Sequence, residues 1–490
     1  MSGKDEEPPK RVIVQVKRQR RLGIDLTLTP REWLPDARNA KLEFTARIYE
    51  FKNGKWEYPG EAKQIMFSFK EVSKENGICM NYPTKDASNT NPDLFFPDDD
   101  SMKEFALDED ETDKSSKKRC PTEILRAKDN PAHSHHYLKA TTKKPVTEAT
   151  VTVRCEDYGA FGILKVEAED CETLKSRERV AGCQGLGEKE EDKEVRIPRD
   201  DNGNNIADNA AQDKNKDGTK ALPDKDEDDT PTGNGVEGDG LTNYEEYRGF
   251  IIGGGGKAKK EHIRTSITQK DLFIYIEHSE LSAHLSYFNQ TGLKARILYD
   301  PDLYDGNTSR VINFNKTSAT KAEQHGLWLR KEGDDDARGV TYFSKKPYIP
   351  GNCTRVAIMV QTIKDEGLAN MLDRVVAHEL GHAIGMEHHG DGTGPNPSHH
   401  VCGGIDYYNR NGLEISGNIN CIMRYTGFAN GWCHDTPHHR HPAENPPIVG
   451  NIYCNSDTGT GINNPGAGHF SNDATKGDCQ SQIRVKDWEE

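Results

Sequence analysis

The chain has 490 residues, which is too long for one ordinary hydrophobic core and predicts two or three domains. Its net charge is −15, partly concentrated in one Asp-rich segment, so the composition argues against nucleic-acid binding and suits calcium-dependent folding. No segment is long and apolar enough to cross a bilayer, and the first residues contain no apolar signal-peptide core.

Short strands with alternating apolar and polar residues dominate the first part of the chain. Residues 41–51 show this alternation, and residues 65–69 and 149–155 repeat it. Because polar turns with Gly and Pro separate these strands, we expect an antiparallel β-sandwich of immunoglobulin-like type over residues 10–195. This segment holds no catalytic constellation, which favours a role in anchoring the protein on a surface or a larger protein.

The composition changes abruptly to Asp, Asn and Gly in residues 196–250, which we interpret as a calcium-binding connector. Oxygen-bearing side chains stand at alternate positions, and a glycine such as Gly218 lets the backbone wrap an ion. The stretch resembles EF-hand-like or thrombospondin type 3-like calcium repeats, while Gly235 at a first-ligand position favours irregular, shared sites. The candidate ligands are Asp200, Asn202, Asn204, Asp208, Asp213, Asn215, Asp217, Glu237, Asp239, Asn243 and Glu246. An acidic linker without metal is the alternative.

The glycines at 253–256 precede a lysine but lack the spacing of a phosphate-binding loop, so they predict a flexible joint. The patterns that follow predict an α/β domain with a strand, a helix, three strands, a buried strand and a final helix. In chain order these elements cover residues 271–277, 281–288, 295–299, 311–314, either 327–329 or 340–343, 355–363 and 369–385.

The final helix carries the sequence HELGHAIGMEH, which supplies three imidazoles, a carboxylate and a turn glycine. On a helix, His378 and His382 lie one turn apart on the same face, and Glu379 stands beside that face. Gly385 lets the backbone leave the helix sharply, so that His388 can return as a third nitrogen ligand. A helix with solvated histidines would explain HELGH alone. The spacing of all three histidines in HELGHAIGMEH favours a zinc site with an open fourth coordination position.

This segment resembles the metzincin clan of zinc metallopeptidases, whose second mark is a turn that carries a methionine beneath the zinc. The run CIMRY at 421–425 matches that mark. By this resemblance an α+β catalytic domain covers residues 257–490, Met423 forms an apolar floor under the imidazoles, and Tyr425 lies near the metal. The ligand set implies zinc-dependent hydrolysis of protein or peptide substrates, with Glu379 taking a proton from the metal-bound water.

The cysteines predict disulfides in the second half of the chain. Six of the 11 cysteines fall within or after the catalytic region without C-x-x-C spacing, namely Cys353, Cys402, Cys421, Cys433, Cys454 and Cys479. Calcium, disulfides and a peptidase together predict a secreted or exported protein. A second hypothesis is a calcium-stabilised adhesion or structural protein whose peptidase domain is vestigial or only self-processing.

Overall fold

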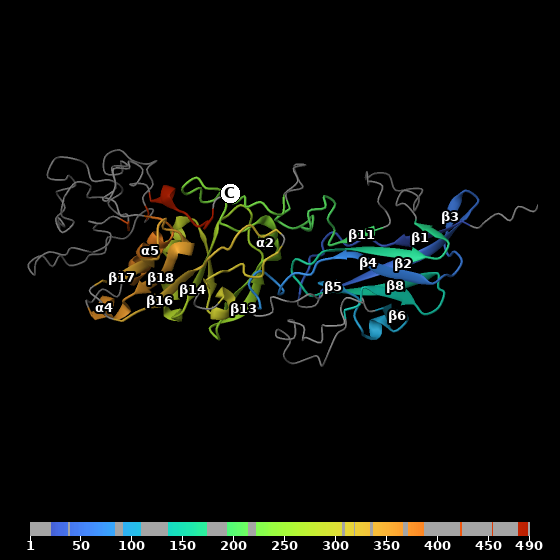
Figure 1. The fold of residues 1–490 in the computed structure, drawn as a ribbon, viewed down its shortest axis with the longest axis horizontal. Coiled ribbons are helices and arrows are strands. Elements are labelled where there is room, and N and C mark those ends of the chain that lie inside the picture. The colour runs from blue at the N-terminus through green and yellow to red at the C-terminus, as the bar shows by residue number, and fades with distance from the viewer. Residues whose placement is uncertain are drawn as a thin grey trace, which may run out of the picture.

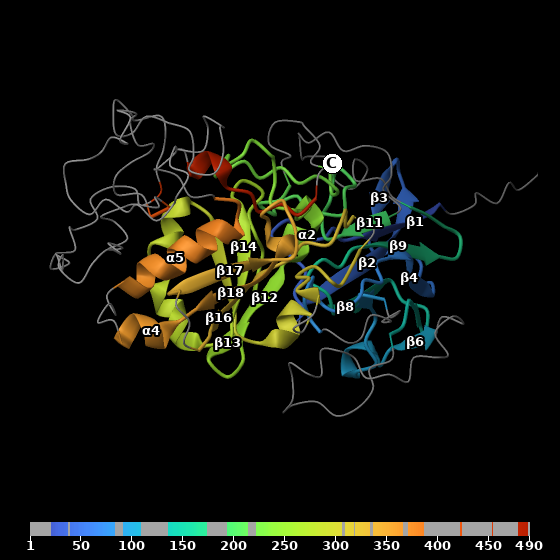
Figure 2. The same cartoon turned by 60° about the vertical axis from the view of Figure 1, so that its left-hand side comes forward.

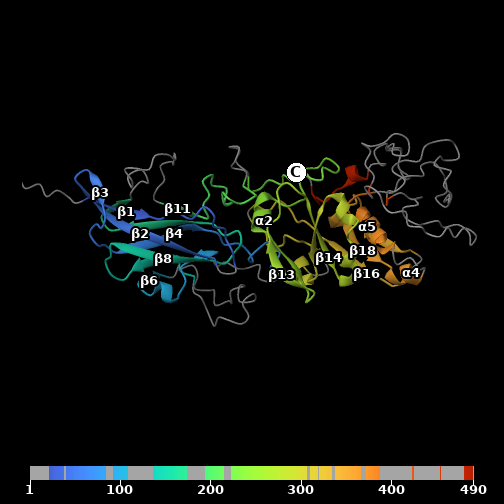
Figure 3. The same ribbon diagram turned by 180° about the vertical axis from the view of Figure 1, so that it is seen from behind.

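The computed structural model describes residues 21–37, 40–83, 92–108, 136–173, 194–213, 222–305, 309–317, 319–333, 337–365, 371–386, 422–423, 453 and 479–488. Across these residues the protein is mostly β-sheet with few helices, and its sheets form two units side by side (Figure 1; Figure 3). The prediction of a β-rich multidomain protein is confirmed at this level. None of the described helices is long and apolar enough to span a membrane.

The first unit contains two β-sheets. The first sheet has the order β10 (Cys171–Thr173), β1 (Leu22–Leu26), β2 (Lys41–Lys52), β8 (Glu148–Cys155) and β5 (Leu94–Phe95), with β3 (Lys55–Glu57) paired to β2. The second sheet has the order β11 (Glu194–Ile197), β9 (Gly162–Ala168), β4 (Ile65–Val72), β7 (Lys139–Thr142) and β6 (Phe105–Asp108).

The core of this unit lies between its two sheets. Phe44 and Val151 from the first sheet and Phe67 and Leu164 from the second belong to one buried cluster, to which η1 (Asp100–Met102) also contributes. Alternate residues of β2 are buried, which confirms the periodicity predicted for residues 41–51. The unit is therefore a sandwich of two sheets.

The second unit is built on a seven-stranded sheet. Its order is β13 (Ala258–Ile263), β12 (Phe250–Gly254), β15 (Lys294–Leu298), β14 (Asp271–Ile276), β16 (Leu327–Lys331), β18 (Cys353–Ile358) and β17 (Gly339–Phe343). The strands from β12 to β18 are parallel to one another, whereas β13 and β17 pair antiparallel at the two edges. The strand β17 is thus an outer strand of this sheet.

Both faces of the seven-stranded sheet are covered. On β14, Leu272 and Ile274 join the core formed with α5 (Leu372–Ala383), while Phe273 and Tyr275 join a cluster on the other face. A strand buried on both faces needs no polar alternation, which explains the unbroken apolar run. Packed against α5 on its face of the sheet are η5 (Ser279–His284) and η6 (Phe288–Thr291), and α4 (Val360–Asp365) follows β18 (Figure 2). Further short turns are η7 (Pro301–Tyr304), η8 (Pro350–Asn352) and η13 (Gln480–Gln482).

Some element predictions need correction. The helix predicted at 281–288 consists of the two 3-10 turns η5 and η6, whose apolar side chains are buried against α5. Helical spacing of apolar residues does not separate a continuous helix from consecutive tight turns. Instead of a strand, residues 311–314 form a single β-bridge, between Val311 and His325. The two alternative positions for the third strand, 327–329 and 340–343, both lie in strands, namely β16 and β17. The strand predicted at 355–363 ends at Ile358, where the chain turns into α4.

The glycines predicted as a flexible joint form a tight hairpin turn between β12 and β13. Gly253 to Gly256 all have positive φ values, and a Cβ atom on Gly255 would stand 2.2 Å from the carbonyl oxygen of Tyr299. Only glycine adopts this path without strain or collision. The segment therefore belongs to the sheet.

A buried ion pair connects the two units. Arg248 ends the helix α2 (Asn243–Arg248) and is fully buried, and its Nη2 donates to Oδ2 of Asp157, which follows β8, at 2.6 Å. The same guanidinium donates to the backbone carbonyl oxygen of Asn315 at 3.1 Å. One apolar cluster also contains Tyr158 from the first unit and Phe250 from the second. The units therefore share a core at their junction.

Candidate active site and acidic connector

The helix α5 places His378, Glu379 and His382 in the interior. Its apolar residues, including Val376 and Leu380, are buried in the core beneath the sheet, which fixes the rotation of the helix. The ring centres of the two histidines lie 4.8 Å apart with an interplanar angle of 88°. Two imidazoles bound through Nε2 to one tetrahedral ion would hold their ring centres roughly 5 Å apart, so these two rings can share a metal.

Backbone carbonyl oxygens orient both imidazoles. The distance from Nδ1 of His378 to the carbonyl oxygen of Ile422 is 2.8 Å, and the same distance separates Nδ1 of His382 from the carbonyl oxygen of Met386. A carbonyl accepts only from a protonated nitrogen, so Nδ1 carries the hydrogen and Nε2 presents the lone pair. Burial lowers the pKa of His378 to about 3 and that of His382 to about 4, which keeps both rings neutral.

The carboxylate of Glu379 is held by the edge strand β17. The hydroxyl of Thr341 donates to Oε2 of Glu379 at 2.8 Å and lies 2.7 Å from the carbonyl oxygen of the same residue. Burial raises the pKa of Glu379 to about 7. A Cβ atom on Gly339 would stand 2.6 Å from Cγ of Glu379, so the glycine allows the strand to approach the helix closely.

The turn after α5 leads out of the helix. Gly385 has φ +95°, and a Cβ atom there would stand 2.9 Å from the carbonyl oxygen of Gln482. The backbone N–H of Arg484 donates to the carbonyl oxygen of Ile384 at 2.8 Å. The segment 479–488 therefore supports the end of the helix that carries the histidines. The predicted third ligand His388 and the predicted Tyr425 lie outside the described residues.

Met423 packs directly against α5. It is fully buried, and a Cβ atom on Gly381, between the two histidine positions, would stand 2.9 Å from its Sδ. Its neighbour Ile422 supplies the carbonyl that orients His378. The buried Tyr453 donates its hydroxyl to the carbonyl oxygen of Ala377 at 2.7 Å. Residues 422–423 and Tyr453 are distant from α5 in the sequence, and their contacts therefore fix the position of this helix.

The first group of candidate calcium ligands lies on one loop, where backbone and amide groups already contact several of its oxygens. The Oδ1 atom of Asp200 accepts the backbone N–H of Asn204 at 3.1 Å, and Oδ1 of Asp208 accepts another backbone N–H at 2.8 Å. The amide of Asn202 donates to Oδ1 of Asp213 at 3.0 Å. Burial raises the pKa of Asp213 to about 6.

The candidates further along the connector have different surroundings. Asn215 and Asp217 lie outside the described residues, and Glu237 is exposed. The side-chain amide of Asn243 donates to the carbonyl oxygen of Leu222 at 3.0 Å. By contrast, Asp239 and Glu246 are almost completely buried.

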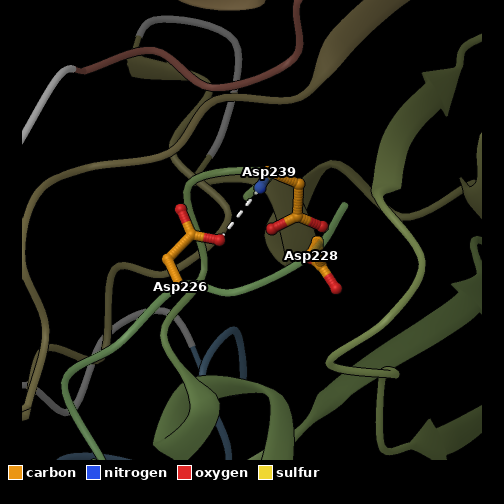
Figure 4. A group of neighbouring side chains, drawn as sticks. All are labelled: Asp226, Asp228 and Asp239. Atoms are coloured by element: carbon orange, nitrogen blue, oxygen red, sulfur yellow. Dashed lines mark hydrogen bonds between the residues drawn. The ribbon is translucent and has the colours of Figure 1, made fainter. Parts of the chain in front are cut away.

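A buried acidic cluster forms around Asp239. Among the described residues, Asp226, Asp228 and Asp239 form a group in which one carboxylate oxygen from each side chain lies within 4.8 Å of the other two (Figure 4). Burial, reinforced by neighbouring carboxylates, raises the pKa of Asp228 to about 8, and burial raises that of Asp271 to about 6.

Five of these residues are not among those predicted from the sequence. Asp226 and Asp228 alternate in the acidic run at 224–229, which is the signal used for the other calcium candidates and could have identified them. Asp271, Thr341 and Tyr453 meet their partners only through contacts between distant segments, which no local pattern reports.

The cysteines described by the structure are buried or half-buried. Cys353 is a buried free thiol, and Cys479 is buried in the core around α5. The other four cysteines of the predicted disulfide set lie outside the described residues, so disulfide bonding in this region stays a prediction.

Comparison with known proteins gives no relative for this chain. No protein-family model, no curated protein and no solved structure matches it.

Proposed function

We propose that the chain is a zinc endopeptidase of metzincin type. The observation that carries this proposal is the pair of buried, neutral imidazoles one helical turn apart, with Nδ1 of each tied to a carbonyl oxygen and a buried carboxylate on the adjoining residue. Neutral imidazoles with a fixed tautomer and a neighbouring carboxylate are the donor set of a catalytic zinc site. In this proposal His388 completes the ligand set.

In the proposed peptide hydrolysis each residue of the site has a separate role. A zinc ion supplies Lewis-acid polarisation and lowers the pKa of bound water toward neutrality. Glu379 takes a proton from the attacking water and returns it to the leaving amine. Thr341 holds the carboxylate in position for both transfers. Tyr425 assists the developing oxyanion as a hydrogen-bond donor.

The edge strand β17 suggests how a substrate is held. It is the outer strand of the seven-stranded sheet, and its Thr341 contacts Glu379. An extended peptide can pair with such an edge through main-chain hydrogen bonds, which brings its peptide bonds near the carboxylate. This arrangement supports protein or peptide substrates.

The proposal extends to the whole chain. Residues 257–490 would form the metzincin-like catalytic domain, although its sheet already begins at Phe250. The sandwich of residues 10–195 would be of immunoglobulin-like type and anchor the enzyme on a surface or a large protein, and the protein would act after secretion or export. The buried junction through Arg248 supports a fixed orientation of the sandwich relative to the peptidase.

Metal removal tests the proposal directly. The full chain should contain one zinc per molecule and hydrolyse an unfolded protein such as casein, and dialysis against 1,10-phenanthroline should abolish both zinc content and hydrolysis. Stoichiometric zinc should restore activity, whereas magnesium should not, because the site offers imidazole nitrogens. A zinc-loaded protein that cleaves no member of a broad peptide library would instead favour the adhesion or structural hypothesis.

Replacement of Thr341 by valine should lower kcat by roughly 10-fold, with little change in KM. The substitution keeps the shape of the side chain but removes the hydrogen bond to the carboxylate of Glu379. Steady-state kinetics and zinc analysis measure the effect, and Thr341→Ser should restore activity. The matched control is Thr354→Val, an exposed threonine that donates to the carbonyl oxygen of Tyr342 at 3.1 Å. Equal losses in both valine variants would contradict the assigned positioning role.

A further inference from the structure

A group of buried carboxylates lies where the acidic connector meets the seven-stranded sheet. Asp226, Asp228 and Asp239 come from two parts of the connector, and each brings one carboxylate oxygen within 4.8 Å of an oxygen of the other two (Figure 4). Their relative exposures are 4%, 0% and 1%, so water does not screen them. Carboxylates gathered in this way repel each other strongly unless positive charge lies between them.

Two further carboxylates lie at the same place. Oδ2 of Asp239 accepts the backbone N–H of Asp271 at 2.7 Å, which brings the first residue of β14 against the cluster. Glu246 lies on α2, and the carboxylates of Asp228 and Asp271 act on it electrostatically. The capping box of Thr242 and Glu245 fixes the start of that helix. The fold thus places Asp271 and Glu246 beside the three aspartates.

Two of the five side chains lack hydrogen bonds of normal geometry. Both carboxylate oxygens of Asp228 and both of Glu246 are buried, and no donor meets them at hydrogen-bond distance and angle, although Asp239 and Thr265 lie near them. Native proteins rarely leave buried polar oxygens unsatisfied, and each such group needs a specific explanation. Four unsatisfied oxygens beside other carboxylates indicate a binding site for a cation.

The neighbouring positive charges do not balance the cluster. Lys486 Nζ lies 3.0 Å from Oδ2 of Asp226, and Arg296 pairs with Asp271. The buried Lys270 also acts on the cluster, although its Nζ donates to the carbonyl oxygen of Val236 at 2.6 Å. Even with Lys294, which also acts on Asp271, five ionised carboxylates outnumber the four nearby cations, and a divalent ion would offset the excess negative charge.

We propose that this cluster binds one calcium ion, with Asp228 and Glu246 as principal ligands and Asp239, Asp226 and Asp271 completing the oxygen shell. The site is composed of residues from the connector, α2 and β14, and calcium binding there does not depend on peptidase activity. The donors are all hard oxygens, which excludes a preference for zinc. Calcium accepts six to eight oxygens in irregular geometry, whereas magnesium retains several of its waters, so a crowded carboxylate site favours calcium.

The site would also fix the C-terminal segment. Lys486 reaches the cluster through Asp226, and Ile483 and Val485 of the same segment are buried in the core around α5. The same segment donates the backbone N–H of Arg484 to the end of α5. If the proposed peptidase function holds, calcium would therefore stabilise the helix that carries the histidines.

Calcium binding by the full chain tests this site. Protein stripped of metal and reloaded with one equivalent of zinc should bind calcium in isothermal titration calorimetry. Its Tm should rise by on the order of 5–10 °C at calcium concentrations about 100-fold above the dissociation constant. Asp228→Asn and Glu246→Gln should each bind one calcium fewer than the wild type. The matched control is Asp229→Asn, which alters the exposed carboxylate next to Asp228 and should leave the stoichiometry unchanged.

The calcium-free state provides the second measurement. Because burial and the repulsion from Asp226 and Asp271 outweigh the attraction of Lys270, Asp228→Asn should have a Tm equal to or above that of the wild type without calcium, and its rise with calcium should be smaller. A wild type that binds no calcium, or variants that bind as much as the wild type, would overturn the site. Neither measurement uses hydrolysis, so an inactive peptidase would leave the result intact.

Discussion

Replacement of Glu379 by glutamine should reduce kcat for peptide hydrolysis by about 10²–10⁴-fold while one zinc per chain is retained. The amide has the shape of the carboxylate and can still accept the hydrogen bond from Thr341, so the fold around α5 should be preserved. It cannot take a proton from water, however, and the loss should therefore appear in kcat rather than in KM. Single-turnover kinetics with a fluorogenic peptide and zinc analysis measure both quantities.

A matched control separates this effect from a general change of charge. Glu280 on η5 is exposed, and Glu280→Gln should leave hydrolysis unchanged. If Glu379→Gln retained full activity, Glu379 could not be the general base. If the variant lost zinc together with activity, its role would be to support the metal rather than to transfer protons.

Replacement of Arg248 by methionine should lower the free energy of unfolding by about 3–5 kcal/mol. The guanidinium is completely buried, and Asp157 accepts from its Nε at 3.0 Å and from its Nη2 at 2.6 Å. Removing it leaves the carboxylate of Asp157 buried without its counter-charge and also leaves the carbonyl oxygen of Asn315 without this donor. Denaturant unfolding followed by fluorescence measures the loss.

An exposed ion pair within the β-sandwich provides the comparison for the buried pair of Arg248 and Asp157. Arg47 donates to Glu148 at 2.6 Å, and both side chains are about two-fifths exposed. Arg47→Met should change stability by less than about 1 kcal/mol, because water and salt screen this pair. Adding Asp157→Asn to Arg248→Met should recover part of the loss, since no buried charge then remains. Similar effects of the two single methionine variants would show that the junction contributes little.

Local sequence patterns predicted strands of two kinds, those with one face in a core and those with both faces covered. Alternation in residues 41–51 gave β2 because alternate residues of that strand enter the core of the sandwich. The apolar run at 271–277 gave β14 for the opposite reason, since both of its faces are covered. Local patterns failed at 281–288 and at the glycines after Phe250, because helical spacing and glycine content describe turns as well as helices and joints.

The sequence by itself determined the spacing of His378, Glu379 and His382, because residues one helical turn apart share a face in any α-helix. It also determined the accumulation of hard oxygen donors in the connector. Only the tertiary structure decided which of those oxygens meet, since Asp228, Glu246 and Asp271 converge through a loop, a helix and a strand. It likewise decided that a threonine 38 residues before Glu379 holds the carboxylate. Such contacts depend on how sheets and helices pack, and the cost of burying charge then restricts which side chains can occupy them.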